Sequence, residues 1–194
     1  MLEEVLRSGF AEMGIAADGT AIGRFRGYYD ALEAKNAVMN LTAIRGEDES
    51  ARLHFLDSAS PLLLGSLAGR RVIDVGTGAG FPGLPLKILE PEMQLTLLDS
   101  LGKRVDFLRE VCTALSLPGV ECVHGRAEEP GERRETYDAA VSRRGAAFRA
   151  LRALPALCEA RRRFLRAQGS RRGGGARGGW ARRRHPRRAR RAHF

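Results

Sequence analysis

The stretch from Val72 to Gly83 combines residue types that could bind a small polar ligand. It reads Val-Ile-Asp-Val-Gly-Thr-Gly-Ala-Gly-Phe-Pro-Gly. A β-branched apolar run, typical of a buried strand, precedes three glycines at alternate positions, and a helical pattern of Leu and Ile follows. A strand, a glycine turn and a helix let the backbone approach a ligand closely and direct N–H groups toward it.

The glycine spacing narrows the choice of ligand. Gly76, Gly78 and Gly80 follow a G-x-G-x-G pattern, whereas the dinucleotide fingerprint G-x-G-x-x-G has its third glycine one residue later. No Gly-Lys-Ser/Thr follows, which excludes a P-loop. Asp74 ends the first strand, where it can orient the loop or accept hydrogen bonds, and Asp99 ends the next. A glycine turn that only joins strand to helix is the alternative.

The rest of the pattern predicts the elements that position this stretch. Apolar residues at helical spacing predict helices, and short β-branched runs predict strands. We expect helices over 2–13, 21–38, 48–56, 83–89 and 102–116, and strands over 70–75, 94–98, 119–124 and 137–141. Strands that alternate with helices indicate an α/β fold with a parallel sheet, in which ligands bind at the carboxyl ends of the strands. The first helices form a cap.

His54, Asp57 and Ser58 are a further polar set before the first strand. His54 and Asp57 lie three residues apart and would share one face of a helix, which permits a hydrogen bond. Two interpretations stay open, a structural polar contact and a role beside the ligand.

Composition excludes several protein classes. There is no run of about 18 apolar residues and no signal-peptide pattern at the N-terminus, so we expect no membrane span. The cysteines, Cys112, Cys122 and Cys158, are odd in number and lack metal-ligand spacing. They predict core thiols, a reduced cytoplasmic setting and no bound metal.

The net charge of +10 conceals a division of the chain into two parts. Residues 1–143 contain 13 Arg, 3 Lys and 22 acidic residues, a formal charge of −6. Residues 144–194 contain 17 Arg, no Lys and one acidic residue, a formal charge of +16. This change in composition marks a boundary.

Six short motifs follow one another in the order and spacing of a known family. In addition, the early third glycine and Asp99 at the end of the next strand resemble the wider class I of S-adenosylmethionine-dependent methyltransferases. The motifs are Asn40-Leu41-Thr42; His54-x-x-Asp57-Ser58; Asp74 to Gly83; Leu97-Leu-Asp-Ser-Leu-Gly-Lys-Arg104; Gly125-Arg-Ala-Glu128; and Tyr137-Asp-x-x-x-Ser-Arg143. Residues of about 1–143 therefore resemble the bacterial 16S ribosomal RNA guanine-N7 methyltransferase family, also called glucose-inhibited division protein B.

The resemblance implies a class I, Rossmann-like methyltransferase fold and methylation of N7 of one guanine in the 16S ribosomal RNA of the small subunit. The implied methyl donor is S-adenosyl-L-methionine. The residues expected to bind it are Gly76, Gly78, Phe81, Asp99, Ala127, Glu128 and Arg143. Of these, Ala127 and Glu128 should border the adenine, and Asp99 should hold the ribose by analogy with the wider class.

The reaction requires no nucleophile, general base or metal from the protein. N7 of guanine carries an in-plane lone pair, so the enzyme chiefly positions the two reactants and excludes water. RNA binding requires positive charge. Lys103 and Arg104 follow Asp99, and they are expected to contact RNA or a ligand phosphate, or else to be solvated residues at the start of a helix.

The expected domain runs over 1–169, with a helical cap at 1–66, a βα core at 67–143 and a less regular part at 144–169. A helix over 146–160 is possible, and 163–169 resembles a later strand of the family. An Arg-rich, disordered tail is expected over 170–194. This basic segment is interpreted as an RNA-binding arm, a solvated tail, or the product of a reading-frame shift in a GC-rich gene.

Alternative functions follow from these interpretations. One is a non-catalytic RNA-binding protein in which the tail does the binding, and another is an inactive, truncated or frame-shifted methyltransferase with Ala139 and Val141 poorly covered. An NAD-dependent oxidoreductase is disfavoured by the glycine spacing.

Overall fold

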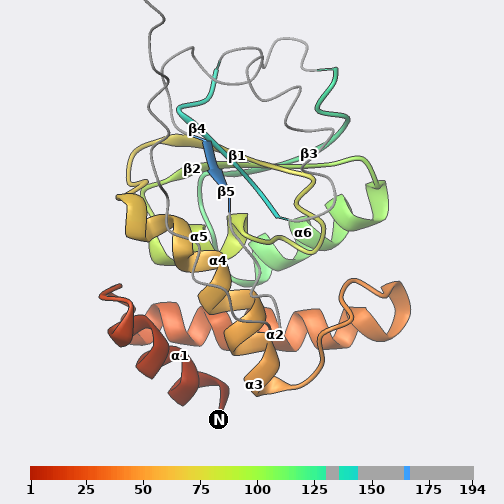
Figure 1. Cartoon of the computed structure of the whole chain (residues 1–194). Coiled ribbons are helices and arrows are strands. Elements are labelled where there is room, and N and C mark those ends of the chain that lie inside the picture. Colours follow the sequence, from red (N-terminus) through yellow and green to blue (C-terminus); the bar gives the residue numbers. More distant parts are fainter. Residues whose placement is uncertain (130–135, 144–163, 167–194) are drawn as a thin grey trace, which may run out of the picture.

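A parallel sheet and a group of N-terminal helices make up the structure (Figure 1), a computed structural model that describes residues 1–129, 136–143 and 164–166. The sheet has the strand order β3-β2-β1-β4-β5, and all neighbouring strands are parallel. The strands are β1 (Arg71–Val75), β2 (Gln94–Asp99), β3 (Val120–His124), β4 (Ala139–Ser142) and β5 (Phe164–Arg166).

β1 and β2 are mostly apolar and buried along their length because both faces of a central parallel strand are covered. Val72 and Leu97 belong to the larger core, which also includes α5 (Gly83–Leu89) and α6 (Gly102–Ala114). Ile73 and Leu98 belong to a second, smaller cluster that includes Tyr137. The register pairs Asp74 with Leu97 and with Val141, so the carboxyl ends of β1, β2 and β4 lie at the same edge of the sheet.

The cap consists of six helical segments before the first strand. They are α1 (Leu2–Glu12), α2 (Gly19–Met39), α3 (Glu47–Ser50), the π-helix η1 (Ala51–Leu56), α4 (Asp57–Ala59) and the 3₁₀ helix η2 (Ser60–Leu64). Asp18 caps α2 by accepting a hydrogen bond from the Ala21 N–H at 2.7 Å, as expected of an N-cap aspartate. Asn40 ends α2 in the left-handed conformation.

An aromatic series connects the cap to the sheet layer. The ring centroids of Phe25 and Phe55 are 5.1 Å apart, those of Tyr28 and Phe55 are 5.5 Å apart, and those of Tyr28 and Phe81 are 5.3 Å apart. Because Phe81 belongs to the glycine stretch, the cap packs directly on the loop that the sequence singles out. In Figure 1, α2, α5 and α6 lie on one side of the sheet.

The predicted elements of the first 143 residues are confirmed in type, and the structure adds the short segments α4 and η2, which were not predicted. The expected helix over 48–56 is a short α-helix that continues as the π-helix η1, a form often found at functional sites. The expectation that Ala139 and Val141 would be poorly covered is wrong, because both side chains are buried in the larger core cluster, and β5 pairs with the edge of β4. The possible helix at 146–160 and the tail at 170–194 lie outside the described residues.

Candidate functional site

The glycine stretch forms a tight loop that is held against the end of β2. Gly76, Gly78 and Gly80 have φ values of 69°, 63° and 107°, a region that side chains rarely adopt. The N–H of Gly76 donates to the carbonyl of Leu98 at 2.8 Å, and the N–H of Gly80 donates to the carbonyl of Thr77 at 2.9 Å. The backbone conformation of the loop by itself therefore favours glycine at all three positions.

Asp99 connects this loop to the start of α6. Its Oδ2 accepts the Gly78 N–H at 2.9 Å, and its Oδ1 accepts the Leu101 N–H at 2.9 Å. Arg104 Nη1 lies 3.7 Å from Oδ2. The Asp99 side chain is only 4% exposed, so this acidic group at the carboxyl end of β2 is almost fully removed from bulk water. Each carboxylate oxygen has a second lone pair with which to accept a further hydrogen bond.

Asp74, in β1, holds both ends of the glycine loop through hydrogen bonds. Its Oδ2 accepts hydrogen bonds from the Thr77 hydroxyl at 2.7 Å and from the Gly83 N–H at 2.8 Å. Its Oδ1 is buried and has no hydrogen-bond partner among the described residues. Burial raises the pKa of Asp74 to about 7, against the lowering effect of these two hydrogen bonds.

Gly78 and Gly80 face different surroundings. A Cβ atom added to Gly78 would meet no atom within 4 Å, so this face of the loop is open to a ligand. A Cβ atom added to Gly80 would lie 2.5 Å from the Tyr28 hydroxyl. That hydroxyl donates to the carbonyl of Ala79. Gly78 is therefore the loop position whose small size leaves room for a ligand, and Gly80 is needed for packing.

Phe81, His54 and Arg143 form one cluster next to the loop. The rings of His54 and Phe81 are stacked, with centroids 4.4 Å apart and an interplanar angle of 6°. The Arg143 guanidinium lies over the Phe81 ring at 5.2 Å from its centroid. Arg143 Nη1 donates to His54 Nδ1 at 2.7 Å, and Nη2 donates to the carbonyl of Leu53 at 2.7 Å. The end of β4, the glycine loop and the π-helix meet at this point.

The hydrogen bonds of His54 determine its protonation state. Arginine only donates, so Nδ1 must accept and the proton of the neutral ring lies on Nε2. Nε2 lies 2.8 Å from the Thr42 hydroxyl, and Thr42 is in turn held by two hydrogen bonds with the Asn36 amide, each of 3.0 Å. Burial, followed by the charge of Arg143, lowers the pKa of His54 to about 3.

The structural interpretation of His54 is confirmed, while a role beside the ligand stays a prediction. It makes structural contacts with Thr42 and Arg143, and those contacts place it against Phe81 beside the loop. The hydrogen bonds of its two ring nitrogens go to these partners and not to Asp57. Ser58 is fully buried.

The loop after β3 also lies at the carboxyl ends of the strands. The Gly125 N–H donates to the carbonyl of Asp99 at 3.0 Å, which holds the segment that follows against the end of β2. Ala127 is buried in the smaller core cluster and Glu128 is exposed. Ser142 Oγ donates to the carbonyl of Val75 at 2.8 Å and so ties the end of β4, with Arg143 beyond it, to the end of β1.

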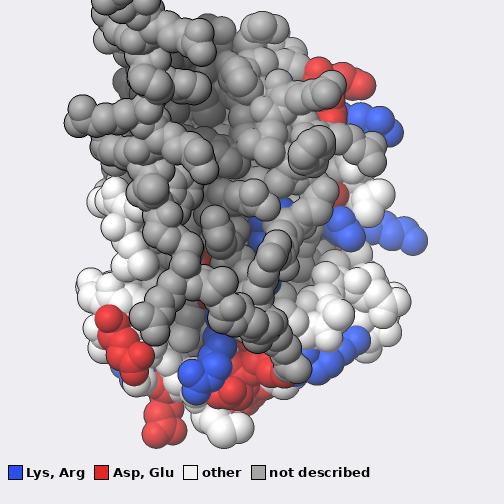
Figure 2. All heavy atoms as spheres, viewed as in Figure 1, with Lys and Arg blue, Asp and Glu red and all other residues white. Residues whose placement is uncertain are grey.

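The two basic residues after Asp99 differ in their surroundings. Arg104 is half-buried and ion-paired with Asp99, while Lys103 is exposed at the first turn of α6. Over the cap, acidic and basic groups lie side by side (Figure 2), in agreement with the Arg26–Glu47 pair at 2.7 Å and the Arg52–Asp48 pair at 3.1 Å. The described cap residues on this face therefore form no broad basic surface.

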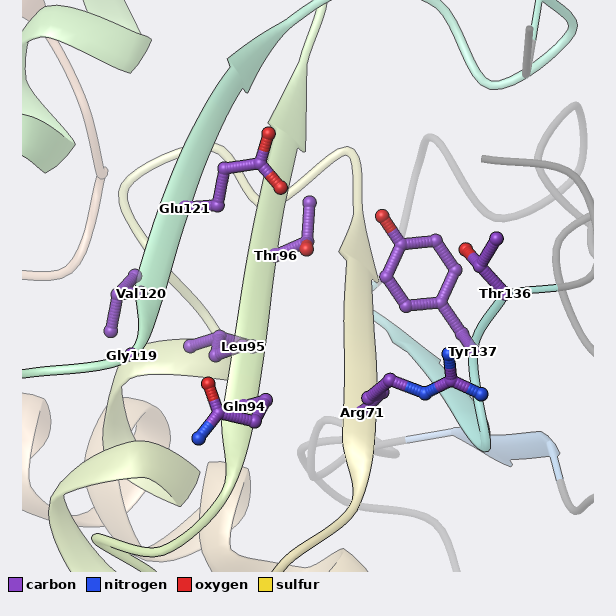
Figure 3. Close-up of a pocket in the computed structure, with 9 residues that line it drawn as sticks. All are labelled: Arg71, Gln94, Leu95, Thr96, Gly119, Val120, Glu121, Thr136 and Tyr137. Carbon is purple, nitrogen blue, oxygen red and sulfur yellow. The ribbon is translucent and has the colours of Figure 1, made fainter. Parts of the chain in front are cut away.

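A pocket of about 820 Å³ lies elsewhere, at the amino ends of the strands (Figure 3). Among its lining residues, Arg71 and Gln94 begin β1 and β2, and Gly119 directly precedes β3. None of the residues that the sequence predicts for ligand binding lines it. Since ligands of parallel sheets bind at the carboxyl ends, this pocket is separate from the site.

The described residues contain no group of three or more His, Cys, Asp or Glu side chains that could hold a metal ion. They also contain no helix that is long and apolar enough to cross a membrane.

The structure brings together the predicted Gly76, Gly78 and Asp99 in one contact network, and Phe81 and Arg143 in another. The sequence motifs single out neither Tyr28 nor Asn36, although both contact this part of the fold. Asn36 is a fully buried polar residue on the apolar side of α2, and such a residue requires specific partners. Its position among apolar residues was the available signal.

Comparison with known proteins gives the context for this geometry. The sequence model of the GidB family, with the description rRNA small subunit methyltransferase G, matches residues 21–171. The match extends beyond Arg143, where the expected resemblance ended. Ribosomal RNA small subunit methyltransferase G of Alkaliphilus metalliredigens is 48% identical over 151 residues, which cover 76% of this chain and 63% of the relative. That of Carboxydothermus hydrogenoformans is 44% identical over 153 residues, covering 77% and 65%.

The chain spans slightly less than two thirds of the length of these relatives. Among solved structures, one reported as a candidate S-adenosyl-L-methionine-dependent methyltransferase from Methanococcus maripaludis superposes with a TM-score of 0.55 at 14% identity, covering 72% of this chain and 62% of that chain. The YcgJ protein of Bacillus subtilis gives 0.51 at 21% identity, covering 58% and 50%. These likenesses show the Rossmann-like α/β fold of class I methyltransferases.

Proposed function

The chain belongs to the rRNA small subunit methyltransferase G family, and on this premise we propose that it methylates N7 of a guanine in 16S ribosomal RNA with S-adenosyl-L-methionine as donor. The substrate is the small ribosomal subunit or its RNA, which places the reaction in the cytoplasm. The observation that carries the proposal is the Gly78 N–H bound to Asp99, with open space where a Gly78 side chain would be.

The residues at the carboxyl ends of the strands fit this donor. The open face of Gly78 admits a ligand against the backbone, and Asp99 has spare lone pairs for ribose hydroxyls. The unpartnered Oδ1 of the buried Asp74 can accept a hydrogen bond from a polar group that enters the loop. Residues that we assign to the donor are Gly76, Gly78, Phe81, Asp99, Ala127, Glu128 and Arg143.

When bound, S-adenosyl-L-methionine supplies a methyl group on a sulfonium centre that is a good leaving group. The guanine N7 lone pair attacks without prior loss of a proton, so the chain supplies no general base. Asp99 and the loop hold one reactant, and the Phe81–His54–Arg143 cluster forms a rigid, largely buried wall beside it. Such positioning and exclusion of water are the main contributions of this site to the rate.

Lys103 is proposed to contact an RNA phosphate, because it is exposed one turn from Asp99. We assign Arg104 a second role besides RNA binding, which is to hold the Asp99 carboxylate in place. Its ion pair with Asp99 keeps it at the ligand edge, where it steadies the carboxylate as well as facing incoming phosphate.

Titration calorimetry tests donor binding first. S-adenosyl-L-methionine and S-adenosylhomocysteine are titrated into the full chain and into Asp99→Asn, with Asp106→Asn, an exposed acid on α6, as the matched control. We expect micromolar binding that is weakened at least tenfold only by the change at Asp99. Equal binding by all three chains would contradict the assignment of the site.

Methylation is then assayed on small ribosomal subunits that lack the modification, with detection of N7-methylguanosine by mass spectrometry after nuclease digestion. Methyl transfer supports the proposal. Donor binding without methyl transfer would favour the inactive, frame-shifted chain. RNA binding that depends only on residues 170–194, with no donor binding, would favour the non-catalytic RNA-binding protein.

A further inference from the structure

Two half-buried thiols outside the ligand site lie next to one another. Cys112 belongs to the last turn of α6 and Cys122 to β3, and both are free cysteines. They lie on two elements that pack against each other, and each thiol has the largest influence on the pKa of the other. Neither residue takes part in the site at the carboxyl ends of the strands, and neither belongs to the six motifs found in the sequence.

The two thiols share access to solvent. Both line one surface hollow of about 780 Å³, together with Arg109 on α6 and Glu121 on β3. A hollow of this size admits small thiol reagents. The two cysteines therefore differ from buried core thiols, which are inert because reagents do not reach them.

The charges around the hollow distinguish the two thiols. Arg109 is held by Asp106 at 2.9 Å and donates to the carbonyl of Cys122 at 3.2 Å. The contact with Cys112 and the positive charge of Arg109 lower the pKa of Cys122. The contact with Cys122 and burial raise the pKa of Cys112. Cys122 is the thiol that ionises more readily, and the thiolate is the nucleophilic form.

We propose that Cys112 and Cys122 form an oxidisable dithiol site, which hydrogen peroxide closes to an intramolecular disulfide that joins α6 to β3. The Cys122 thiolate attacks one peroxide oxygen and becomes a sulfenic acid as hydroxide leaves. The Cys112 sulfur then attacks the Cys122 sulfur, and the sulfenic oxygen leaves as water. In sum, two thiols and one peroxide give one disulfide and two waters.

The bond would join two elements that already pack against each other, α6 and β3, beside the hollow that both cysteines line. The bond closes the short loop from Cys112 to Cys122, which restricts the unfolded chain and so stabilises the folded one. The inference makes no use of the proposed methyltransferase activity and can be tested without it.

Peptide mapping tests the proposal on the full chain. Cys158→Ser removes the third thiol, and the folded protein is treated with hydrogen peroxide, quenched with an alkylating reagent and digested with a protease that cleaves after glutamate. Cleavage after Glu110, Glu121 and Glu128 puts Cys112 and Cys122 on different peptides. We expect the two peptides to remain joined until a reductant is added. Separate peptides with singly oxidised or alkylated cysteines would overturn the proposal.

Two further measurements test the dithiol site without relying on peptide mapping alone. Phenylarsine oxide, which bridges two neighbouring thiols, is expected to bind the reduced Cys158→Ser chain and to lose its binding when either Cys112→Ser or Cys122→Ser is added. The oxidised chain is expected to unfold about 5 °C above the reduced chain. Arsenical binding that survives either substitution, or a midpoint that falls on oxidation, would contradict the site.

Discussion

Arg143 and His54 are separated by 89 residues in the sequence and joined by a hydrogen bond of 2.7 Å, in which Nη1 of the arginine donates to Nδ1 of the histidine. This bond connects the end of β4 to the cap. It also makes the orientation of a residue that we assign to the donor site depend on a helix from another part of the fold.

Replacement of His54 by alanine should weaken binding of S-adenosylhomocysteine about tenfold. The change removes the acceptor of a charge-assisted hydrogen bond, worth roughly 1.5–3 kcal/mol, and the ring stacked on Phe81. Titration calorimetry measures the effect. Arg52→Ala, an exposed change in the same π-helix, is the control and should bind as the wild type does. Unchanged affinity in His54→Ala would show that Arg143 is positioned without it.

The same variant should change how stability depends on pH. The folded chain keeps His54 neutral because its pKa is lowered to about 3, whereas the unfolded chain takes up a proton near pH 6.5. The contribution of His54 is therefore complete above pH 6.5 and is lost as the pH falls toward 3. Between pH 7 and 5 the wild type should lose about 2 kcal/mol relative to His54→Ala. Urea unfolding at each pH gives the difference, and parallel pH profiles would contradict it.

Asp74 should act in the opposite direction. Its pKa is raised from 3.8 to about 7, so the folded chain retains a proton that the unfolded chain releases. Its contribution to stability is greatest below pH 3.8 and declines as the pH rises to 7. Between pH 5 and 8 the wild type should lose about 2 kcal/mol relative to Asp74→Asn. Denaturant unfolding of both chains at the two pH values measures this difference, and a wild type that gains stability relative to the variant would refute it.

Alanine substitutions at Gly78 and Gly80 should separate ligand binding from packing. Both residues have positive φ, but only the Cβ atom at Gly80 meets an atom of the folded chain. We expect Gly78→Ala to cost about 1 kcal/mol of stability and to reduce donor binding strongly. Gly80→Ala should cost about 3 kcal/mol, since it adds a steric conflict with Tyr28. Unfolding free energies and calorimetry on both variants make the comparison, which fails if Gly78→Ala binds normally.

Lys103→Ala should weaken binding to 16S ribosomal RNA. It should also reduce the slope of the logarithm of the binding constant against the logarithm of the salt concentration by about one, the amount expected for one phosphate contact. The physical reason is the loss of one exposed cation beside the site. Lys35→Ala, on the cap and ion-paired with Glu110, is the matched control. Binding measured over a range of salt concentrations gives both slopes. Equal slopes for the two variants would remove Lys103 from the RNA surface.

The local spacing of apolar residues and glycines was sufficient to predict most of the helices and strands. The β-branched run before Gly76 predicts a buried strand, and the apolar spacing after Gly83 predicts α5 with its observed bounds. Asn40, which begins the first of the six motifs, is the left-handed end of α2. The π-helical turn of η1 was not predicted, because its extra residue per turn leaves no clear mark in the spacing of so short a segment. A strand within 163–169 was expected only from the family resemblance, and its pairing with β4 was not predicted, because a strand of three residues carries too little periodicity.

The sequence by itself determined the succession of strands and helices along the chain, the glycine loop and the edge of the sheet where we expect a ligand to bind. These follow from periodicity, from the conformational freedom of glycine and from the common direction of parallel strands. Only the tertiary structure decided what the polar residues contact. It assigned Asp99 to the Gly78 N–H, His54 to Arg143 and Thr42, and Cys112 to Cys122. Such contacts depend on how separate elements pack together, and the spacing of residues along the chain carries no record of the distances between those elements.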